Sequence, residues 1–199
     1  MLTRALLLIG AYFLGAIPTG LLIARARGKD LRTVGSGNIG ATNATRALGK
    51  GWGALVLLLD AFKGFAPAWL SARLVLDHAQ ILPSLAGAFA VLGHCTTPFL
   101  RFKGGKGVAT GFGAYLGLAP LAALAGLGGY VLGLVVGRAS SIGSLVGVTV
   151  VPIMCVVLGK PPAVSLAALG VWLVVVARHT DNLKKIARGE EGFRARPSR

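Results

Sequence analysis

The chain has 199 residues, of which 54% are hydrophobic and only 14% are charged, and its mean hydropathy of +0.73 excludes a water-soluble domain of this size. Its 21 Lys and Arg residues against 6 Asp and Glu residues give a net charge of +15. Because a charge at the bilayer centre costs about 2.5 to 3.5 kcal/mol, the basic residues must collect at the membrane interfaces, and we expect no nucleic-acid partner.

Seven apolar segments of roughly bilayer length follow one another along the chain. They cover 3–24, 52–75, 81–99, 106–119, 121–137, 142–158 and 161–178. The first is no secretory signal, since its positive cluster follows the apolar run instead of preceding it. The pattern predicts an all-α, polytopic integral membrane protein with seven transmembrane helices, forming one domain over 1–199 with a short basic tail at 192–199. Because the fourth segment is short, five spans with re-entrant pieces are the alternative.

The distribution of charge predicts the orientation of these segments. Loops 25–50, 101–106 and 138–141 fall on the same side as the C-terminal tail and together with it carry nearly all basic residues, whereas the other side receives only Arg4, Arg73 and Lys160. The positive-inside rule therefore predicts an external N-terminus and a cytoplasmic C-terminus. Four polar segments, at 35–43, 103–107, 138–141 and 179–191, share the cytoplasmic side, where we expect the active site.

A glycine-rich segment at 35–40 matches G-x-G-x-x-G, but its neighbours are spanning helices and not the strand that a dinucleotide fold requires. An interfacial turn is one interpretation. The other is an anion site, in which glycines allow backbone N–H groups to approach the ligand and a helix begins near Ala41. Thr42 and Arg46 would then share a face of that helix.

A second glycine-rich segment, Lys103-Gly-Gly-Lys-Gly107, lacks the first glycine and the Ser or Thr of a Walker A loop. Its lysines could anchor the chain at the interface. Three glycines weaken a helix end and are not needed for anchoring, which favours a phosphate cradle. Asp60 and Lys63, three residues apart inside a spanning segment, are expected to pair structurally.

The C-terminal segment places His179 three residues before Asn182, and a continuing last helix would project both beside Ser140 and Ser141. Interfacial capping is the alternative for this pair, and His94 is either a core histidine or part of a polar site. No histidine is followed five residues later by Asp, so the H-x-x-x-x-D base of soluble and peripheral glycerolipid acyltransferases is absent. Carboxylates fit to hold a metal are absent too.

These segments together resemble the bacterial acyl-phosphate:glycerol-3-phosphate acyltransferases. The first family motif is similar to Gly35–Asn43 with Arg46, the second to Gly93-His94 with Phe102–Thr110, and the third to His179-x-x-Asn182 with Gly189-x-Glu191. Asp60-x-x-Lys63-Gly64 and Ser141 also match the family, so the resemblance covers nearly the whole chain. One departure is Thr96-Thr97 before Pro98, where the family usually has an aromatic residue and proline.

The resemblance implies transfer of a fatty acyl group from acyl phosphate to the 1-hydroxyl of sn-glycerol 3-phosphate, giving lysophosphatidate and inorganic phosphate. It implies an enzyme without metal or cofactor in the bacterial inner membrane among its lipids. We expect a monomer, although the sequence does not determine the oligomeric state. The expected catalytic residues are His179, Asn182, Ser141 and Lys106. The expected substrate-binding residues are Ser36, Gly37, Asn38, Thr42, Asn43, Arg46, His94, Lys103, Gly104, Gly105 and Glu191.

Two alternatives come from other classes of protein. A membrane carrier for phosphorylated solutes would use the same basic residues, although no internal repeat typical of such carriers is visible. An acyltransferase that uses acyl-coenzyme A would need a nucleotide site, and none is recognisable. The sequence leaves open the acyl-chain preference and the group that accepts the proton.

Overall fold

The computed structural model describes residues 1–191, and within this range it contains helices and no strand. The predicted basic tail at 192–199 lies outside the described residues. The α-helices are α1 (Leu2–Ala16), α2 (Thr19–Ala26), α3 (Ala41–Leu48), α4 (Lys50–Leu74), α5 (Ile81–Cys95), α6 (Val108–Leu118), α7 (Pro120–Gly137), α8 (Ser140–Val157), α9 (Pro162–Ala177) and α10 (Thr180–Ala187). Two single-turn 3₁₀ helices, η1 (Leu31–Thr33) and η2 (Pro98–Leu100), lie in loops.

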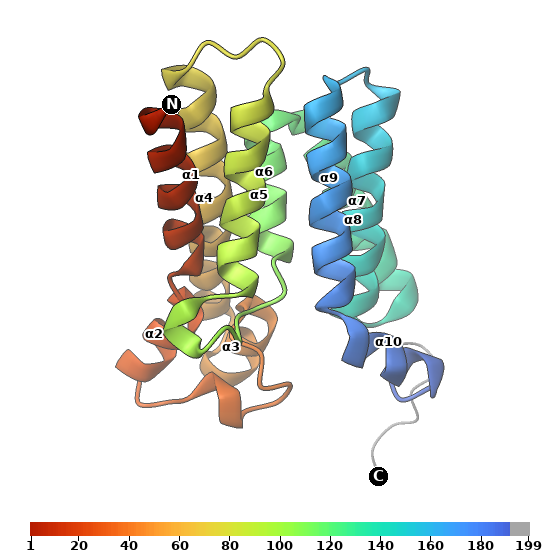
Figure 1. The fold of residues 1–199 in the computed structure, drawn as a ribbon. Helices are drawn as coiled ribbons and strands as arrows, with labels where there is room; N and C mark the ends of the chain where they lie inside the picture. The colour runs from red at the N-terminus through yellow and green to blue at the C-terminus, as the bar shows by residue number, and fades with distance from the viewer. Residues whose placement is uncertain (192–199) are drawn as a thin grey trace.

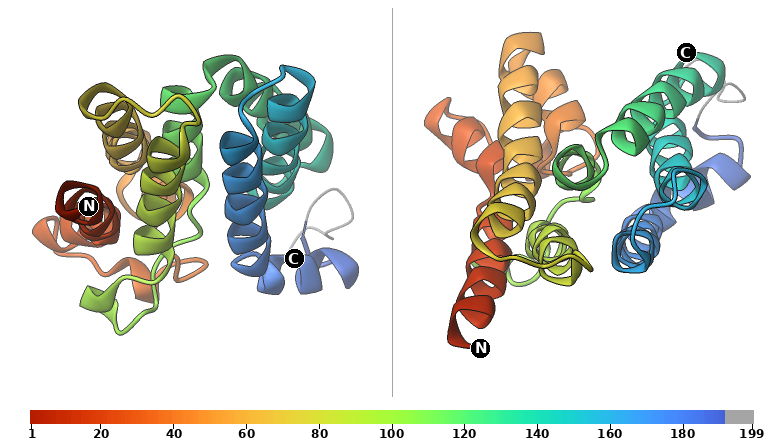
Figure 2. Two further views of the ribbon diagram at one scale, coloured as in Figure 1. Left: turned by 45° about the horizontal axis from the view of Figure 1, so that its top comes forward. Right: turned by 90° about the horizontal axis from the view of Figure 1, so that it is seen from above.

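The long helices stand side by side in two groups, with α1, α4, α5 and α6 in one and α7, α8 and α9 in the other (Figures 1 and 2). The short helices α2, α3 and α10 lie at one common end of the bundle, the lower end in Figure 1. Each predicted apolar segment corresponds to one of these long helices, so the all-helical prediction is confirmed.

Four helical stretches are long and apolar enough to cross a membrane by themselves. They are 2–26, α4, α7 and α8, and a fifth exists if α9 and α10 count as one span bent by 60°. Helix α6 has only 11 residues, because it starts after Gly107 in the left-handed conformation at φ 82° and stops before Pro120. Apolar helices of this length and number establish an integral membrane architecture.

Close packing of the helices depends on small residues. A Cβ atom added to Gly64 on α4 would lie 1.8 Å from the Thr110 carbonyl oxygen of α6, and one added to Gly113 would lie 1.8 Å from the Ala61 carbonyl oxygen. Van der Waals contact drives helix association in lipid, and glycine allows the backbones to approach. The α4–α6 pair, which carries Asp60 on one side of the cavity described below, is therefore rigidly packed.

The first apolar segment is broken, whereas the sequence predicted one continuous helix over 3–24. Pro18 has no N–H group and interrupts the hydrogen-bond ladder between α1 and α2. Two side chains satisfy the carbonyls at the break: Thr97 Oγ1 donates to Ala16 at 2.6 Å, and Lys63 Nζ donates to Ile17 at 2.8 Å. Because lipid offers no hydrogen bonds to a free carbonyl, these contacts make the break possible.

Replacing Thr97 by Val should destabilise the protein while preserving its shape. The hydroxyl group is buried, and its loss leaves the Ala16 carbonyl unsatisfied at a cost of about 1 to 3 kcal/mol. We expect a lower thermal unfolding midpoint in detergent, with Thr3→Val in the exposed first turn of α1 as the matched control. Equal midpoints for Thr97→Val and the wild type would contradict the capping role.

The predicted pairing of Asp60 with Lys63 is confirmed. Lys63 Nζ lies 2.8 Å from Asp60 Oδ1, and both side chains are buried. Thr19 donates to the same carboxylate, and Lys63 Nζ lies 3.4 Å from His94 Nδ1. Opposite charges within hydrogen-bond reach make this ion pair tolerable inside a bilayer.

Candidate active site

A cavity of about 750 Å³ lies between the two groups of helices and is lined by residues from both. All four polar segments that the sequence predicted to share one side contribute to its polar part. This part contains Ser36, Asn38, Thr42, Asn43, Arg46, Asp60, His94, Lys106, Arg138, Ser140, Ser141, His179, Asn182, Lys185, Glu190 and Glu191. Of the predicted site residues, Gly37, Lys103, Gly104 and Gly105 do not line the cavity.

The apolar part of the cavity extends between α6, α7, α8 and α9. It is lined by Val108, Phe112, Tyr115, Ala123, Leu127, Val148, Val151, Ala168 and Val171. From Ser141 to Val151 the lining follows α8 over a rise of about 15 Å. The cavity therefore suits an amphipathic molecule with a polar head and a hydrocarbon chain.

The first glycine-rich segment folds over Asn43, whose side chain is buried. Its Nδ2 donates to the carbonyl oxygens of Leu31, Val34 and Asn38 at 2.8 to 3.0 Å, and its Oδ1 accepts from Ser36 N at 3.3 Å. The polar atoms of the Asn43 side chain therefore form hydrogen bonds within the loop and fix its conformation.

The helix expected to follow this loop is α3. Thr42 and Arg46 line the cavity from the same face of α3, as their spacing predicted. The loop shaped by Asn43 and this face of α3 together form part of the wall of the polar part on the side of the first helix group.

The backbone N–H groups of Gly104 and Gly105 in the second glycine-rich segment are not available to bind a phosphate, although the sequence favoured a phosphate cradle there, because they form hydrogen bonds within the protein. Gly104 N donates to the Cys95 carbonyl at 3.1 Å, and Gly105 N donates to the His94 carbonyl at 3.0 Å. Lys103 is exposed and lies outside the cavity, whereas Lys106 lines it. The glycines serve close packing here, since a Cβ atom on Gly105 would lie 2.1 Å from His94 Nε2.

A hydrogen-bonded network connects the two helix groups across the cavity. Lys106 Nζ donates to Asn182 Oδ1, and Asn182 Nδ2 donates to both carboxylate oxygens of Glu191 at 2.9 and 3.0 Å. Ser141 Oγ also donates to Glu191. Burial lowers the pKa of Lys106 from its usual value, while the Glu191 carboxylate opposes that change.

His179 lies between α9 and α10 with 1% of its surface exposed. The chain bends by 60° at this residue instead of continuing as one straight helix, and His179 and Asn182 both line the cavity. His179 Nδ1 lies 2.8 Å from the Val175 carbonyl, which can only accept, so the neutral ring carries its proton on Nδ1. Burial lowers the pKa of His179, leaving Nε2 as an unprotonated acceptor at neutral pH.

Several cavity residues were not identified from the sequence. Arg138 and Lys185 line the polar part, although the sequence predicted only that their segments lie on the cytoplasmic side, and Tyr130 OH lies 3.2 Å from Ser140 Oγ. Thr42 Oγ1 lies 3.1 Å from the same hydroxyl and thereby connects α3 with the first residue of α8. The position of Arg138 beside Ser140 and Ser141 was the available signal. Within residues 1–191, no cluster of three or more His, Cys, Asp or Glu side chains could hold a metal ion.

Comparisons with known proteins agree with this geometry. A family model described as "Glycerol-3-phosphate acyltransferase" matches residues 5–189. The proteins of that name from Geobacter metallireducens and Geotalea daltonii are 46% and 41% identical, each over 96% of this chain and 97% of the relative. A solved structure of PlsY (YgiH), "an integral membrane glycerol 3-phosphate acyltransferase" in its glycerol 3-phosphate form, has a TM-score of 0.90 at 38% identity, covering 95% of this chain and 94% of that one. A second PlsY structure, in the lysophosphatidic acid form, has a TM-score of 0.89 at 36% identity with the same coverage.

Proposed function

The chain belongs to the glycerol-3-phosphate acyltransferase family and is an acyltransferase, and on this premise we propose that its donor is an acyl phosphate and its acceptor the 1-hydroxyl of sn-glycerol 3-phosphate. The products are lysophosphatidate and inorganic phosphate. The observation that carries this proposal is the two-part cavity, in which cationic side chains from both helix groups surround a polar end and a hydrocarbon slot follows it.

The charge of the polar end fits two phosphate-bearing substrates. Arg46, Lys106, Arg138 and Lys185 line it, and guanidinium and ammonium groups form strong charge-assisted hydrogen bonds to phosphate oxygens. The first turn of α6, at Val108 and Ala109, also lies at the cavity, and the N-terminus of a helix favours negative charge. The acyl chain of the donor would occupy the apolar slot between α6 and α9.

The chemistry requires one transfer step. The hydroxyl oxygen of glycerol 3-phosphate forms a bond with the acyl carbonyl carbon, and the bond from that carbon to the phosphate oxygen breaks. Inorganic phosphate leaves with the electron pair, and the hydroxyl proton passes to substrate phosphate. Because an acyl phosphate is already activated, positioning and charge stabilisation suffice without a covalent acyl-enzyme. Denatured enzyme that retains an acyl group on Ser141 or Cys95 after exposure to donor alone would refute direct transfer.

Sealed vesicles that contain the purified protein distinguish the enzyme from a carrier. Labelled glycerol 3-phosphate is supplied with acyl phosphate, with acyl-coenzyme A or without a donor, and products inside and outside are separated. We expect labelled lysophosphatidate only with acyl phosphate, and no label in the lumen without a donor. Unmodified label inside the vesicles would support the carrier. Formation of labelled lysophosphatidate from acyl-coenzyme A would show that acyl-coenzyme A, and not acyl phosphate, is the donor.

We further propose seven spans in a bacterial inner membrane, with an external N-terminus, a cytoplasmic active site and a monomeric enzyme. Arg27 stacks on Trp52 and Arg73 on Trp69, with centroid distances of 5.0 and 5.1 Å. The two tryptophans are separated along α4 by about 26 Å, close to the thickness of a hydrocarbon core. Aromatic and basic residues at these two levels are typical of the membrane interfaces.

Single-cysteine labelling tests this topology in a variant without the two native cysteines, both of which are buried. Lys29→Cys and Glu190→Cys should resist an impermeant reagent in intact cells and react after the membrane is opened, because both lie at the proposed cytoplasmic end. His78→Cys, in the exposed loop at the opposite end, should react in intact cells. Reaction of positions 29 and 190 from opposite sides would exclude the odd number of spans.

A further inference from the structure

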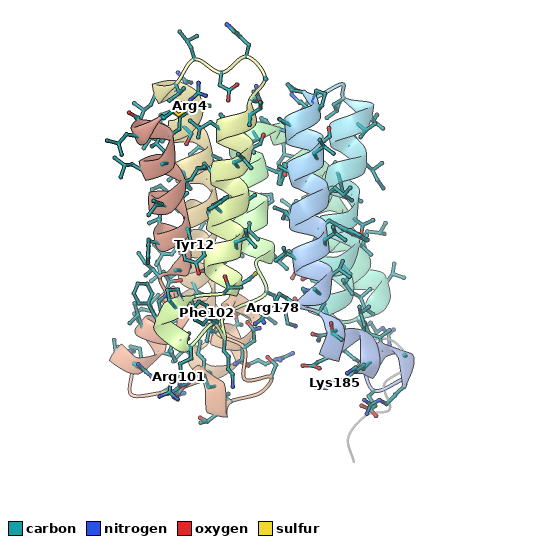
Figure 3. All side chains as sticks on the ribbon, viewed as in Figure 1. Arg4, Tyr12, Arg101, Phe102, Arg178 and Lys185 are labelled. Atoms are coloured by element: carbon teal, nitrogen blue, oxygen red, sulfur yellow. The ribbon has the colours of Figure 1, made fainter. Side chains whose placement is uncertain are left out.

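Arg178 ends helix α9 next to His179 and contacts the second glycine-rich segment across the boundary between the two helix groups. Its Nε donates to the Gly105 carbonyl at 3.1 Å, and one terminal nitrogen donates to the Gly104 carbonyl at 2.7 Å. Figure 3 shows Arg178 at the lower end of α9, facing the loop that carries Arg101 and Phe102. A guanidinium group can bind two successive carbonyls in this way because its donors form a rigid fork.

Every polar backbone atom of the Gly104–Gly105 pair therefore takes part in a hydrogen bond. The two N–H groups donate to the carbonyls of Cys95 and His94 at the end of α5, and the two carbonyls accept from Arg178. Lys106 follows the pair directly, and its Nζ reaches Asn182 on the other side of the cavity. The position of Lys106 relative to His179 and Asn182 therefore depends on the bridge that Arg178 makes.

We propose that Arg178 is a positioning residue, which holds the Gly104–Gly105 backbone so that the Lys106 ammonium group meets the phosphate of a substrate beside His179. Arg178 does not line the cavity, so it acts through Lys106 and not by touching the substrate. Helices α5 and α9 belong to different groups, and this contact ties their lower ends together (Figure 1). The inference rests on the proposed function of Lys106 in substrate binding.

A double-mutant cycle tests this inference, with product formation from acyl phosphate and glycerol 3-phosphate as the measurement. Arg178→Ala should lower kcat/KM by about tenfold in the otherwise wild-type enzyme. In a Lys106→Ala background, the same substitution should lower it by less than about threefold, because the group that Arg178 positions is already gone. Equal losses in both backgrounds, or no loss in the wild type, would overturn the proposal.

Controls separate positioning from general stability. Arg178→Lys keeps the charge and one donor group and should retain an intermediate activity, whereas Arg101→Ala removes an exposed charge from the same loop and should leave activity unchanged. Added guanidinium should partly restore the activity of Arg178→Ala but not that of Lys106→Ala, since Arg178 is exposed and its site is open to a small cation.

Each variant is compared at an equal folded fraction in detergent. Wild-type enzyme without activity on these substrates would refute the proposed function itself, whereas active wild-type enzyme with an additive cycle would refute only the inference.

Discussion

Replacing Lys106 by Ala is expected to lower kcat/KM about ten- to a hundred-fold without unfolding the protein. The Lys106 ammonium group lies in the cavity, half-buried, and donates to Asn182 at the meeting point of the two helix groups. A charge-assisted hydrogen bond to a substrate phosphate contributes about 1.5 to 3 kcal/mol, which corresponds to this loss of rate. Steady-state kinetics with each substrate varied in turn will show which phosphate the lysine binds.

Two other lysines make the comparison specific. Lys103 belongs to the same glycine-rich segment but is exposed outside the cavity, so Lys103→Ala should cost clearly less than Lys106→Ala. Lys184 is an exposed lysine on α10 and serves as the control for loss of charge at this end of the molecule. If Lys103→Ala and Lys106→Ala lose equal activity, binding of phosphate cannot be assigned to the lysine within the cavity.

Periodicity and charge predicted the positions of the helices well, because the apolar segments are separated by charged or glycine-rich loops. They could not predict how a helix bends. The segment 3–24 is apolar throughout, and only Pro18 indicates the break that Thr97 and Lys63 stabilise from distant helices. The bend at His179 has no comparable signal, because the residues around it are compatible with a continuous helix.

The site residues were predicted from residue type and spacing, which do not reveal whether a polar group forms its hydrogen bonds within the protein or remains available to the substrate. Asn43 and the Gly104–Gly105 pair were expected to meet the substrate, but the polar atoms of both are engaged with the protein itself. Arg138 was counted only among the basic residues of the cytoplasmic side, and Arg178 was placed at the end of the last apolar segment. The hydrogen bonds of Arg178 to Gly104 and Gly105 link residues that are far apart along the chain, and only the packing of the two helix groups brings them together.

His179 is the residue for which the structure adds most to the chemistry. The Val175 carbonyl fixes the Nδ1–H tautomer, so Nε2 is the atom of the ring that can accept a hydrogen bond from bound glycerol 3-phosphate. Since burial lowers the pKa of His179 below the usual 6.5, the neutral ring persists through pH 7 and is lost only on acidification. The unfolded state binds the proton more readily than the folded state, so this group also makes the fold less stable as the pH falls below about 6.5.

We therefore expect His179→Ala to lower kcat/KM about a hundredfold, with a weaker saturation by glycerol 3-phosphate as well as a slower turnover, because the acceptor substrate loses a group that orients it. The wild-type rate should decline reversibly on the acid side of neutrality, with recovery after return to pH 7.5 as the check against acid unfolding.

A phosphate monoester has its second pKa near 6. If substrate phosphate takes the proton, an acid limb near that value must persist in His179→Ala, and Asn182→Ala should show it as well. Loss of the acid limb in His179→Ala, together with a rate decrease of about a thousandfold or more, would instead identify His179 as the general base.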